Sequence, residues 1–245
     1  MSSSSRSFEP APQQLTGIDE SALVLLADGH RLLTPVAEAF CRLQKKAALD
    51  GFELAIASSF RSFGRQLAIF NGKASGCRPV HDDRGRAVAM TELDGLGQLQ
   101  AILRYSALPG ASRHHWGTDL DIYDAAAIPA DYSVQLVPEE VADTGFFGPL
   151  HCWLDERMAA GESEGFYRPY GEDKGGVAPE RWHLSYASVA SVYEQRWTAD
   201  VLLDCWRSIL VPGELLLQDI IEEHLPVLIR RYVEVAPGWC PVPLR

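Results

Sequence analysis

The stretch SRHHWGTDLDIYD, residues 112–124, restricts the fold more than any other part of the chain. Residues 119–123 alternate between polar and apolar side chains, and this period of two predicts a β-strand. The apolar residues would face a core, whereas Asp119 and Asp121 would share the opposite face about 7 Å apart. Two carboxylates this close are unfavourable in a folded interior unless protons, basic groups or a cation offset them. The fold must therefore bring a compensating group to this strand.

The spacing of apolar residues elsewhere predicts an α+β fold, in which a small antiparallel sheet is flanked by helices, with helical additions at both ends. Three further short strands are expected at residues 52–57, 165–170 and 182–186. Apolar positions three and four apart predict helices at residues 21–49, where Pro35 would begin the second of two helices, and at 64–70, 96–108, 150–160 and most of 188–236.

The chain divides into three expected parts. Residues 1–17 are polar and rich in Ser and Pro, which predicts a disordered tail. Residues 18–190 hold all the expected strands and would form the main domain, on which residues 191–245 would pack as a helical extension. Residues 71–95 are rich in Gly and charge, and we expect them to form a mobile excursion over the surface.

The composition limits the partners that the protein can have. A net charge of −11 does not provide the basic face that a nucleic-acid binder or a ligand of anionic membranes needs. An anionic substrate would have to be held by locally placed Arg or Lys. No window is apolar and long enough to span a membrane or to act as a signal peptide. We therefore expect a cytoplasmic protein, and leave open a periplasmic protein exported by another route.

The cysteines form no recognisable metal or redox motif. They are scattered and include no CxxC pair, so neither a thiolate zinc site nor a thioredoxin-type site is expected. They are interpreted as thiols in a reducing compartment, while a bridge between the last two stays open. The five are Cys41, Cys77, Cys152, Cys205 and Cys240.

A metal ion would offset the two carboxylates. His114 and His115 directly precede the strand, and a mixed set of imidazoles and carboxylates suits zinc. A catalytic zinc needs three protein ligands, an open position and usually a carboxylate beside the bound water. The segment PERWH, residues 179–183, can supply both missing groups, because Glu180 and His183 lie three residues apart and lead into an apolar strand.

Three segments together resemble a known family. SRHHWGTDLD matches the pattern SxHxxGxxxD, PERWH matches ExxWH, and SSFRS at residues 58–62, followed by Gln66, is similar to an SGYRS…Q stretch. In this order they resemble the VanY-type D-alanyl-D-alanine carboxypeptidases. That zinc peptidase group also contains VanX-type dipeptidases and hedgehog-like domains. The resemblance covers roughly residues 50–190.

The resemblance implies a catalytic domain of the hedgehog and D,D-peptidase type over residues 18–190, with one zinc ion as cofactor. The zinc ligands would be His114, Asp121 and His183, and Glu180 would be the general base. The chemistry agrees with these roles. Zinc lowers the pKa of its bound water from about 15.7 towards 7, and a nearby carboxylate can pass the remaining proton to the leaving amine.

The resemblance also implies a substrate-binding set. Arg61 would grip the substrate, with Ser112 and Gln66 helping to bind its C-terminal end; a planar guanidinium can pair with a carboxylate through two hydrogen bonds. Arg61 could instead stabilise charge that develops on the carbonyl oxygen. Two positions depart from the family pattern. Asp119 replaces a small residue and is expected to orient a ligand or a basic neighbour, and Phe60 replaces a tyrosine.

These expectations converge on a zinc carboxypeptidase that removes the C-terminal D-alanine from peptidoglycan stem peptides or their precursors. One alternative is an endopeptidase of the endolysin type that uses the same zinc. Another is a non-catalytic zinc module, with His115 or Asp119 as a fourth ligand, although His115 is interpreted as structural. A glycosidase using Asp119 and Asp121 fits poorly, because two acids on one strand cannot easily flank a bond.

Overall fold

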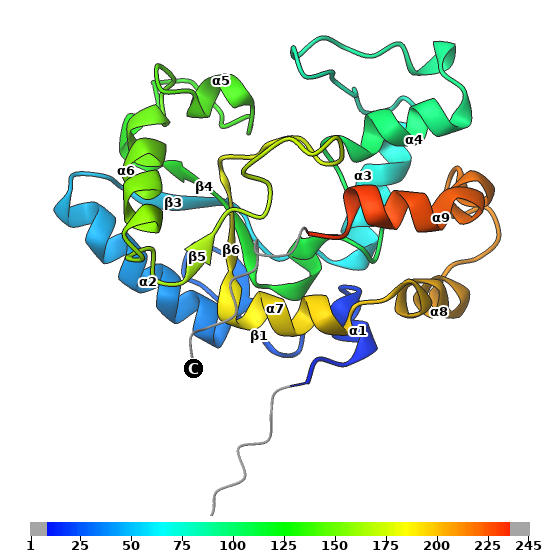
Figure 1. Cartoon of the computed structure of the whole chain (residues 1–245), viewed down its shortest axis with the longest axis horizontal. Helices are drawn as coiled ribbons and strands as arrows, with labels where there is room; N and C mark the ends of the chain where they lie inside the picture. Colours follow the sequence, from blue (N-terminus) through cyan, green and yellow to red (C-terminus); the bar gives the residue numbers. More distant parts are fainter. Residues whose placement is uncertain (1–8, 236–245) are drawn as a thin grey trace, which may run out of the picture.

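The computed structural model describes residues 9–235, and an antiparallel sheet of four strands lies near its centre (Figure 1). All neighbouring strands in this sheet are antiparallel. The predicted α+β class is confirmed, as are all four predicted strands, with shifted ends. Their order across the sheet is β3 (Leu54–Ser58), β4 (Asp119–Asp124), β6 (His183–Tyr186) and β5 (Phe166–Tyr167).

The register of β4 against β6 joins the two motifs found in the sequence. Asp121 is paired with His183, and Asp119 with Ser185. On the other face of β4, the side chains of residues 120 and 122 are fully buried in the core, as the alternation predicts. The strand therefore separates a polar site from a hydrophobic core.

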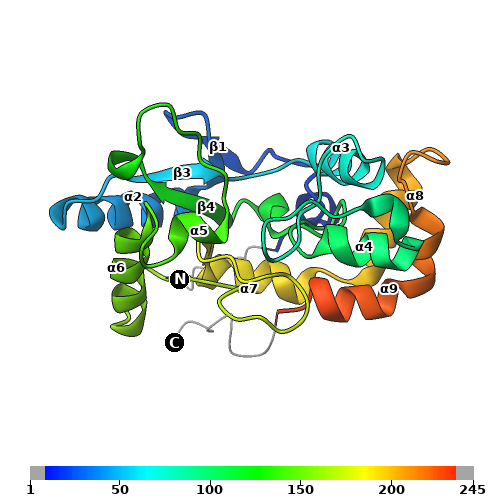
Figure 2. The same ribbon diagram turned by 90° about the horizontal axis from the view of Figure 1, so that it is seen from above.

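Some helices pack on this sheet, and others form a separate group beside it. Figures 1 and 2 show α2 and α6 at one end of the molecule and α3, α4, α8 and α9 grouped at the other. The described α-helices are α1 (Pro12–Leu15), α2 (Thr34–Leu49), α3 (Phe63–Ala74), α4 (Gly95–Leu103), α5 (Pro138–Val141), α6 (Gly148–Ala159), α7 (Ala187–Arg196), α8 (Ala199–Ile209) and α9 (Gln218–Tyr232). Short 3₁₀ helices are η1 (Met90–Glu92), η2 (Arg113–Trp116) and η3 (Ala125–Ala127).

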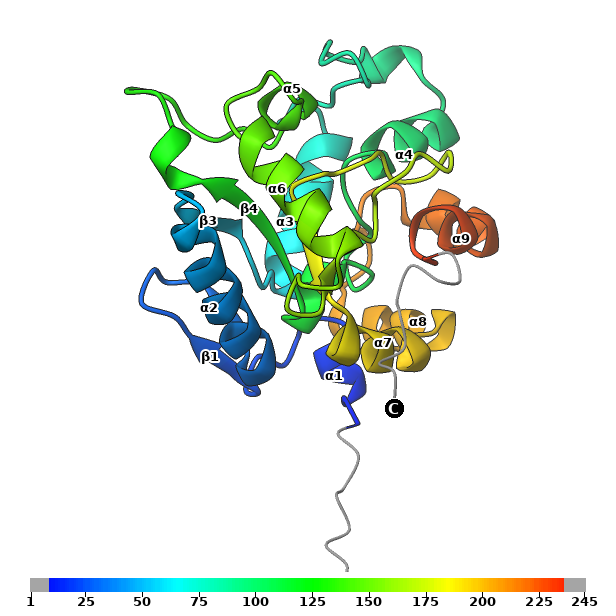
Figure 3. The ribbon, with the colours of Figure 1, turned by 60° about the vertical axis from the view of Figure 1, so that its left-hand side comes forward.

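The molecule has two main hydrophobic clusters. The first joins α2 and α6 to the apolar face of the sheet. The second joins α3 and α4 to α8 and α9 (Figure 3). Because α8 and α9 supply many of its buried side chains, the C-terminal helices share a core with helices from the middle of the chain. The polar face of β4 and β6 lies between the two clusters.

Two helices are expected over residues 21–49, and the prediction of the first one is wrong. These residues begin with a hairpin of β1 (Leu23–Leu25) and β2 (Arg31–Leu33), and only α2 matches the prediction. The turn contains Gly29 at φ +88°, a left-handed conformation that glycine adopts without strain. The apolar spacing of so short a run fits both a helix and a strand, and the turn residues favour the hairpin.

The disordered tail predicted over residues 1–17 is wrong for its second half. Residues 1–8 lie outside the described part, but α1 begins at Pro12, and Leu15 is 2% exposed. Trp116 Nε1 donates a hydrogen bond to the Leu15 carbonyl at 3.1 Å. A side chain at Gly17 would clash with His115, since an added Cβ would lie 2.3 Å from its Nδ1. The N-terminal segment is thus packed against η2.

The excursion predicted over residues 71–95 begins later, because α3 continues to Ala74. Residues 75–92, here called the arm, contain one isolated bridge between His81 and Ala87, and end at η1. Two ion pairs tie the arm down, one within it and one between Asp83 and Arg104.

No helix within residues 9–235 has the length and apolar character needed to cross a membrane. Four of the cysteines, at positions 41, 77, 152 and 205, carry free thiols. Cys240 lies outside the described residues, and so does the bridge to Cys205 that the sequence left open.

Candidate metal centre

The structure brings His114, Asp121 and His183 together although they come from three different elements. His114 lies in η2, Asp121 in β4 and His183 at the start of β6. One ligand atom from each lies within 4.8 Å of the other two, and all three side chains are buried. Asp121 Oδ2 is 3.3 Å from His114 Nε2, and Asp121 Oδ1 is 3.2 Å from His183 Nδ1. These are the three residues that the resemblance implies as ligands.

Two atoms at this point have unsatisfied hydrogen-bonding capacity. Asp121 Oδ1 and His183 Nδ1 are buried and have no hydrogen-bond partner among residues 9–235. A buried polar atom without a partner costs about 1–3 kcal/mol. A cation held between the three side chains would satisfy both atoms. Two nitrogens and one carboxylate are also a donor set that catalytic zinc accepts. The residues therefore fit a metal ion with three protein ligands.

Each imidazole is oriented by a contact on its other nitrogen. His114 Nδ1 donates to the Ser59 carbonyl at 2.9 Å, which leaves Nε2 to face Asp121. His183 Nε2 lies 2.9 Å from Asp119 Oδ1, which leaves Nδ1 to face the site. Such contacts fix the ring and its tautomer, so both unprotonated ligand atoms point at one position.

Asp119 also contacts a buried arginine that the sequence analysis did not single out. Arg113 Nε donates to Asp119 Oδ1 at 2.8 Å, and its Nη2 donates to Tyr167 Oη and Ser185 Oγ, each at 2.9 Å. Burial opposes the charge on Asp119, yet Arg113 and His183 hold the pKa of this carboxyl below its usual range. Asp119 thus orients both a ligand and a basic neighbour, as expected for its position. Only its proximity to His114 in sequence could have drawn attention to Arg113.

His115 is engaged on both nitrogens and is not available to a metal ion. Its Nδ1 donates to the Arg61 carbonyl at 2.5 Å, and its Nε2 accepts from the Gly110 amide at 3.0 Å. Burial, with the nearby Arg61 and His114 adding to it, lowers the pKa of His115 to about 3. The neutral ring therefore ties the Arg61 segment to η2, which agrees with the structural role expected for it.

Glu180 lies beside the three converging side chains. Its Oε2 is 3.5 Å from His183 Nδ1, and its side chain is 14% exposed. The Glu180 amide donates to the Tyr170 carbonyl, and its own carbonyl accepts from the His183 amide. These backbone contacts fix the turn before β6, so the carboxylate stays next to the metal position. Trp182 between them is buried in a small cluster and serves packing.

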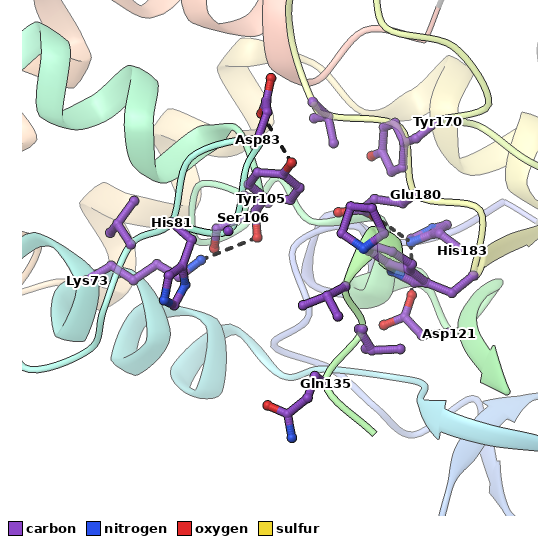
Figure 4. A pocket seen from close by; sticks show the side chains of 18 of the residues that line it. Lys73, His81, Asp83, Tyr105, Ser106, Asp121, Gln135, Tyr170, Glu180 and His183 are labelled. Carbon is purple, nitrogen blue, oxygen red and sulfur yellow. Dashed lines mark hydrogen bonds and ion pairs between the residues drawn. The ribbon is translucent and has the colours of Figure 1, made fainter. Parts of the chain in front are cut away.

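These residues line one end of a cavity of about 530 Å³ (Figure 4). The opposite walls come from the arm at residues 79–85, from residues 105–107 and from the loop at residues 135–139. Tyr232 of α9 closes a further side. The cavity is therefore built from both halves of the molecule.

The predicted substrate residues occupy different positions relative to this cavity. Arg61 and Ser112 line it. Arg61 donates to Gln66 Oε1 at 2.9 Å and to Ser58 Oγ at 3.3 Å. Gln66 is fully buried and does not line the cavity; its amide donates to the Ala107 carbonyl at 2.8 Å. Gln66 thus orients Arg61 from behind and does not reach the cavity itself.

A metal position with two histidines and one aspartate, a neighbouring glutamate and an adjoining cavity define a metal-dependent hydrolase. Residues 29–189 match the model of the family described as VanY: D-alanyl-D-alanine carboxypeptidase. The match covers more than half of the chain, and the protein belongs to this family of peptidases. It is therefore an enzyme of the metallopeptidase class.

Individual proteins are similar over parts of the chain. Two uncharacterized proteins of Haemophilus influenzae (strain Rd) are 48% identical over 101 residues and 32% identical over 128 residues. These matches cover 40% and 51% of this chain, and 69% and 92% of the relatives. Among solved structures, a VanY D,D-pentapeptidase from a VanB-type resistance cassette, in complex with Zn(II), is 23% identical with a TM-score of 0.48. That match covers 74% of this chain and 88% of the other. The LD-carboxypeptidase LdcB is 21% identical with a TM-score of 0.47, covering 80% and 79%.

Proposed function

We propose that the protein is a zinc-dependent carboxypeptidase that removes the C-terminal D-alanine from peptidoglycan stem peptides or their precursors. The observation that carries this proposal is the convergence of His114, Asp121 and His183 beside Glu180, in a cavity that also contains Arg61. The donor set supports zinc. Membership of the VanY family supports a substrate that ends in D-alanyl-D-alanine.

A zinc ion held by His114, Asp121 and His183 would polarise the scissile carbonyl and make a water molecule acidic enough to act as nucleophile near neutral pH. Glu180 accepts the proton of the attacking water. It then delivers this proton to the nitrogen of the departing amino acid. General acid and base catalysis of this kind contributes about 10²–10⁴-fold to the rate.

Arg61 has the geometry to hold the C-terminal carboxylate of the substrate. Gln66 and Ser58 fix its orientation from inside the protein, and no carboxylate among residues 9–235 forms an ion pair with it. Burial lowers the pKa of this guanidinium somewhat, but Asp121 and Glu180 oppose that effect. An oriented arginine that no carboxylate among the described residues pairs with directly favours an anionic ligand with two acceptor oxygens.

An endopeptidase is the second candidate, and the size of the cavity favours it. A volume of about 530 Å³ exceeds what one terminal residue fills, and the walls extend from the arm to α9. Such an enzyme would use the same metal ligands and the same base. Its leaving group would be the amino end of a peptide and not of a single amino acid.

The products of digestion test the proposal. The purified, zinc-loaded protein is incubated with a stem pentapeptide and a stem tetrapeptide, and the products are identified by mass spectrometry. We expect free D-alanine from the pentapeptide, no such release by Glu180→Gln, and unchanged zinc content in that variant. Glu139→Gln is a matched control, because Glu139 lines the same cavity at an exposed position. Internal fragments would support the endopeptidase. Zinc binding without any hydrolysis would support a non-catalytic module.

A further inference from the structure

The cavity contains a second cation, Lys73, which the proposed reaction does not use. Lys73 lies in the last turn of α3, is half-buried and lines the cavity. Its ammonium donates to the Tyr105 carbonyl at 3.3 Å. Among residues 9–235, no carboxylate lies within ion-pair distance of it. One long hydrogen bond leaves most of its donor capacity unused.

The acids on the neighbouring wall are already neutralised by other arginines. Asp83 Oδ2 lies 2.7 Å from Arg104, and Asp82 Oδ2 lies 2.7 Å from Arg86. Because each acid has its own partner, neither compensates the charge of Lys73. A half-buried lysine that lines a cavity and has no ion-pair partner among the described residues is suited to bind an anionic group of a ligand.

The two cations of the cavity lie at different distances from the metal position. The Arg61 guanidinium lies on the side of the metal position, because it donates to Ser58 Oγ at 3.3 Å and Ser58 is paired with Asp121 in the sheet. Figure 4 shows Lys73 and Ser106 at the opposite end of the cavity from the metal ligand His183. Arg61 is thus the cation nearer the metal position and Lys73 the farther one, and Gln66 links the Arg61 guanidinium to Ser106.

Covalent geometry restricts which part of a substrate can reach each cation. In a peptide, the terminal carboxyl carbon is three bonds from the scissile carbonyl carbon, hence at most about 4 Å away. The terminal carboxylate must therefore stay near the metal position, where Arg61 lies. A group at the other end of the cavity belongs to a more distant part of the substrate.

We propose that Lys73, together with the Ser106 hydroxyl, binds a second carboxylate of the substrate, remote from the C-terminal one. This inference rests on the proposed carboxypeptidase function. Ser106 Oγ accepts from Gln66 Nε2 at 3.3 Å, so its own hydrogen remains free to donate into the cavity. The substrate class is thus a peptide that bears a free side-chain carboxylate in addition to its terminal one.

A peptide series tests this inference. All peptides end in D-Ala-D-Ala, and each carries either a glutamate or a glutamine at one of the three positions before that end. For the wild-type, zinc-loaded enzyme we expect kcat/KM to be at least about tenfold higher for the glutamate peptide at one of these positions, because hydrogen bonds to charged groups are the stronger ones. Lys73→Met should abolish the preference and leave the glutamine peptides unaffected, whereas Lys73→Arg should retain it. Lys45→Met, an exposed site on α2, is the matched control.

Binding measurements separate this inference from the proposed function. The Glu180→Gln variant should bind the preferred glutamate peptide at least about tenfold more tightly than its glutamine analogue, in calorimetry without turnover. If no peptide is cleaved but this binding difference is present, only the proposed function fails. Equal cleavage and equal binding of the two series would overturn the inference alone. An equal loss on all peptides in Lys73→Met would also overturn it, because Lys73 would then hold the terminal carboxylate.

Discussion

His183 Nε2 lies 2.9 Å from Asp119 Oδ1, and this contact determines which nitrogen of the ring faces the metal position. The same carboxylate is held by Arg113 at 2.8 Å and by Ser185 at 3.1 Å. Register explains the arrangement, since Asp119 is paired with Ser185 and Asp121 with His183. Two carboxylates on one strand face thus act on one imidazole, one at each nitrogen.

Replacement of Asp119 should therefore weaken metal binding without removing a ligand. We expect Asp119→Asn to lower zinc affinity about 10–100-fold, because the His183 ring loses a charged partner that fixes its orientation. Competition with a chromophoric chelator measures this. Asp124→Asn is a matched control on the same strand, since Asp124 is also buried but only accepts from backbone amides. Equal zinc affinity in the two variants would contradict the assigned role.

Arg61 should require its planar shape as well as its charge. We expect Arg61→Lys to lower kcat/KM about 10–100-fold on a carboxylate-terminated peptide, because lysine cannot form two parallel hydrogen bonds. Zinc affinity should be unchanged. Arg65→Lys, an exposed site in the first turn of α3, serves as control. Steady-state kinetics check the prediction, and unchanged kcat/KM in Arg61→Lys would show that the guanidinium does not grip the substrate.

The sequence predicted the convergence of three metal-binding side chains because local spacing and a family motif both carry it. His114 and Asp121 are seven residues apart, and strand alternation places Asp121 on the polar face. Lys73 and Tyr170 carry no such signal. They come to the cavity only through the packing of α3 and of the turn before β6, which no pattern in their own neighbourhood indicates.

The fold was predictable where one element has one strong pattern. The strand at residues 119–124 and the helix at residues 34–49 follow from their periodicity. The hairpin of β1 and β2 does not follow from periodicity, since LVLL and RLL fit a helix as well as a strand. A glycine at positive φ in the turn favours the hairpin. The buried position of Leu15 depends on a contact with Trp116, a hundred residues away.

Buried neutral histidines should make the protein less stable in acid. Burial, reinforced by Arg168 and Arg181, lowers the pKa of His151 to about 3, and His115 has a similar value. In the unfolded chain a histidine titrates near 6.5. Between about pH 6.5 and 3 the unfolded state therefore binds more protons, and stability falls as the pH falls. Each histidine contributes a slope of about 1.4 kcal/mol per pH unit in this window.

Urea unfolding of the metal-free protein at pH 7 and pH 4.5 measures this effect. Between these two pH values, we expect the free energy of unfolding of His151→Leu to fall by about 2 kcal/mol less than that of the wild type. His224→Leu, on α9, replaces a partly buried ring and serves as the comparison variant. Metal ligands titrate alike in all three proteins and cancel in the comparison. Identical losses in all three would mean that His151 takes up a proton inside the folded protein.

The C-terminal helices should be part of the cooperative fold. Leu228 on α9 is 2% exposed in the cluster that it shares with α3 and α4, while its neighbour Val227 is 60% exposed. We expect Leu228→Ala to lower the free energy of unfolding by about 2–5 kcal/mol, since it leaves a cavity in a packed core. Val227→Ala should change it by less than about 0.5 kcal/mol.

The shape of the thermal transition distinguishes a shared core from an appended one. If α9 unfolds with the rest, Leu228→Ala shifts one calorimetric transition to lower temperature and keeps it single. An independent C-terminal unit would instead give a separate early transition and leave the main one in place. The shared cluster predicts the first result. It also predicts that peptide cleavage is lost in that same transition, because Tyr232 at the end of α9 forms part of the cavity wall.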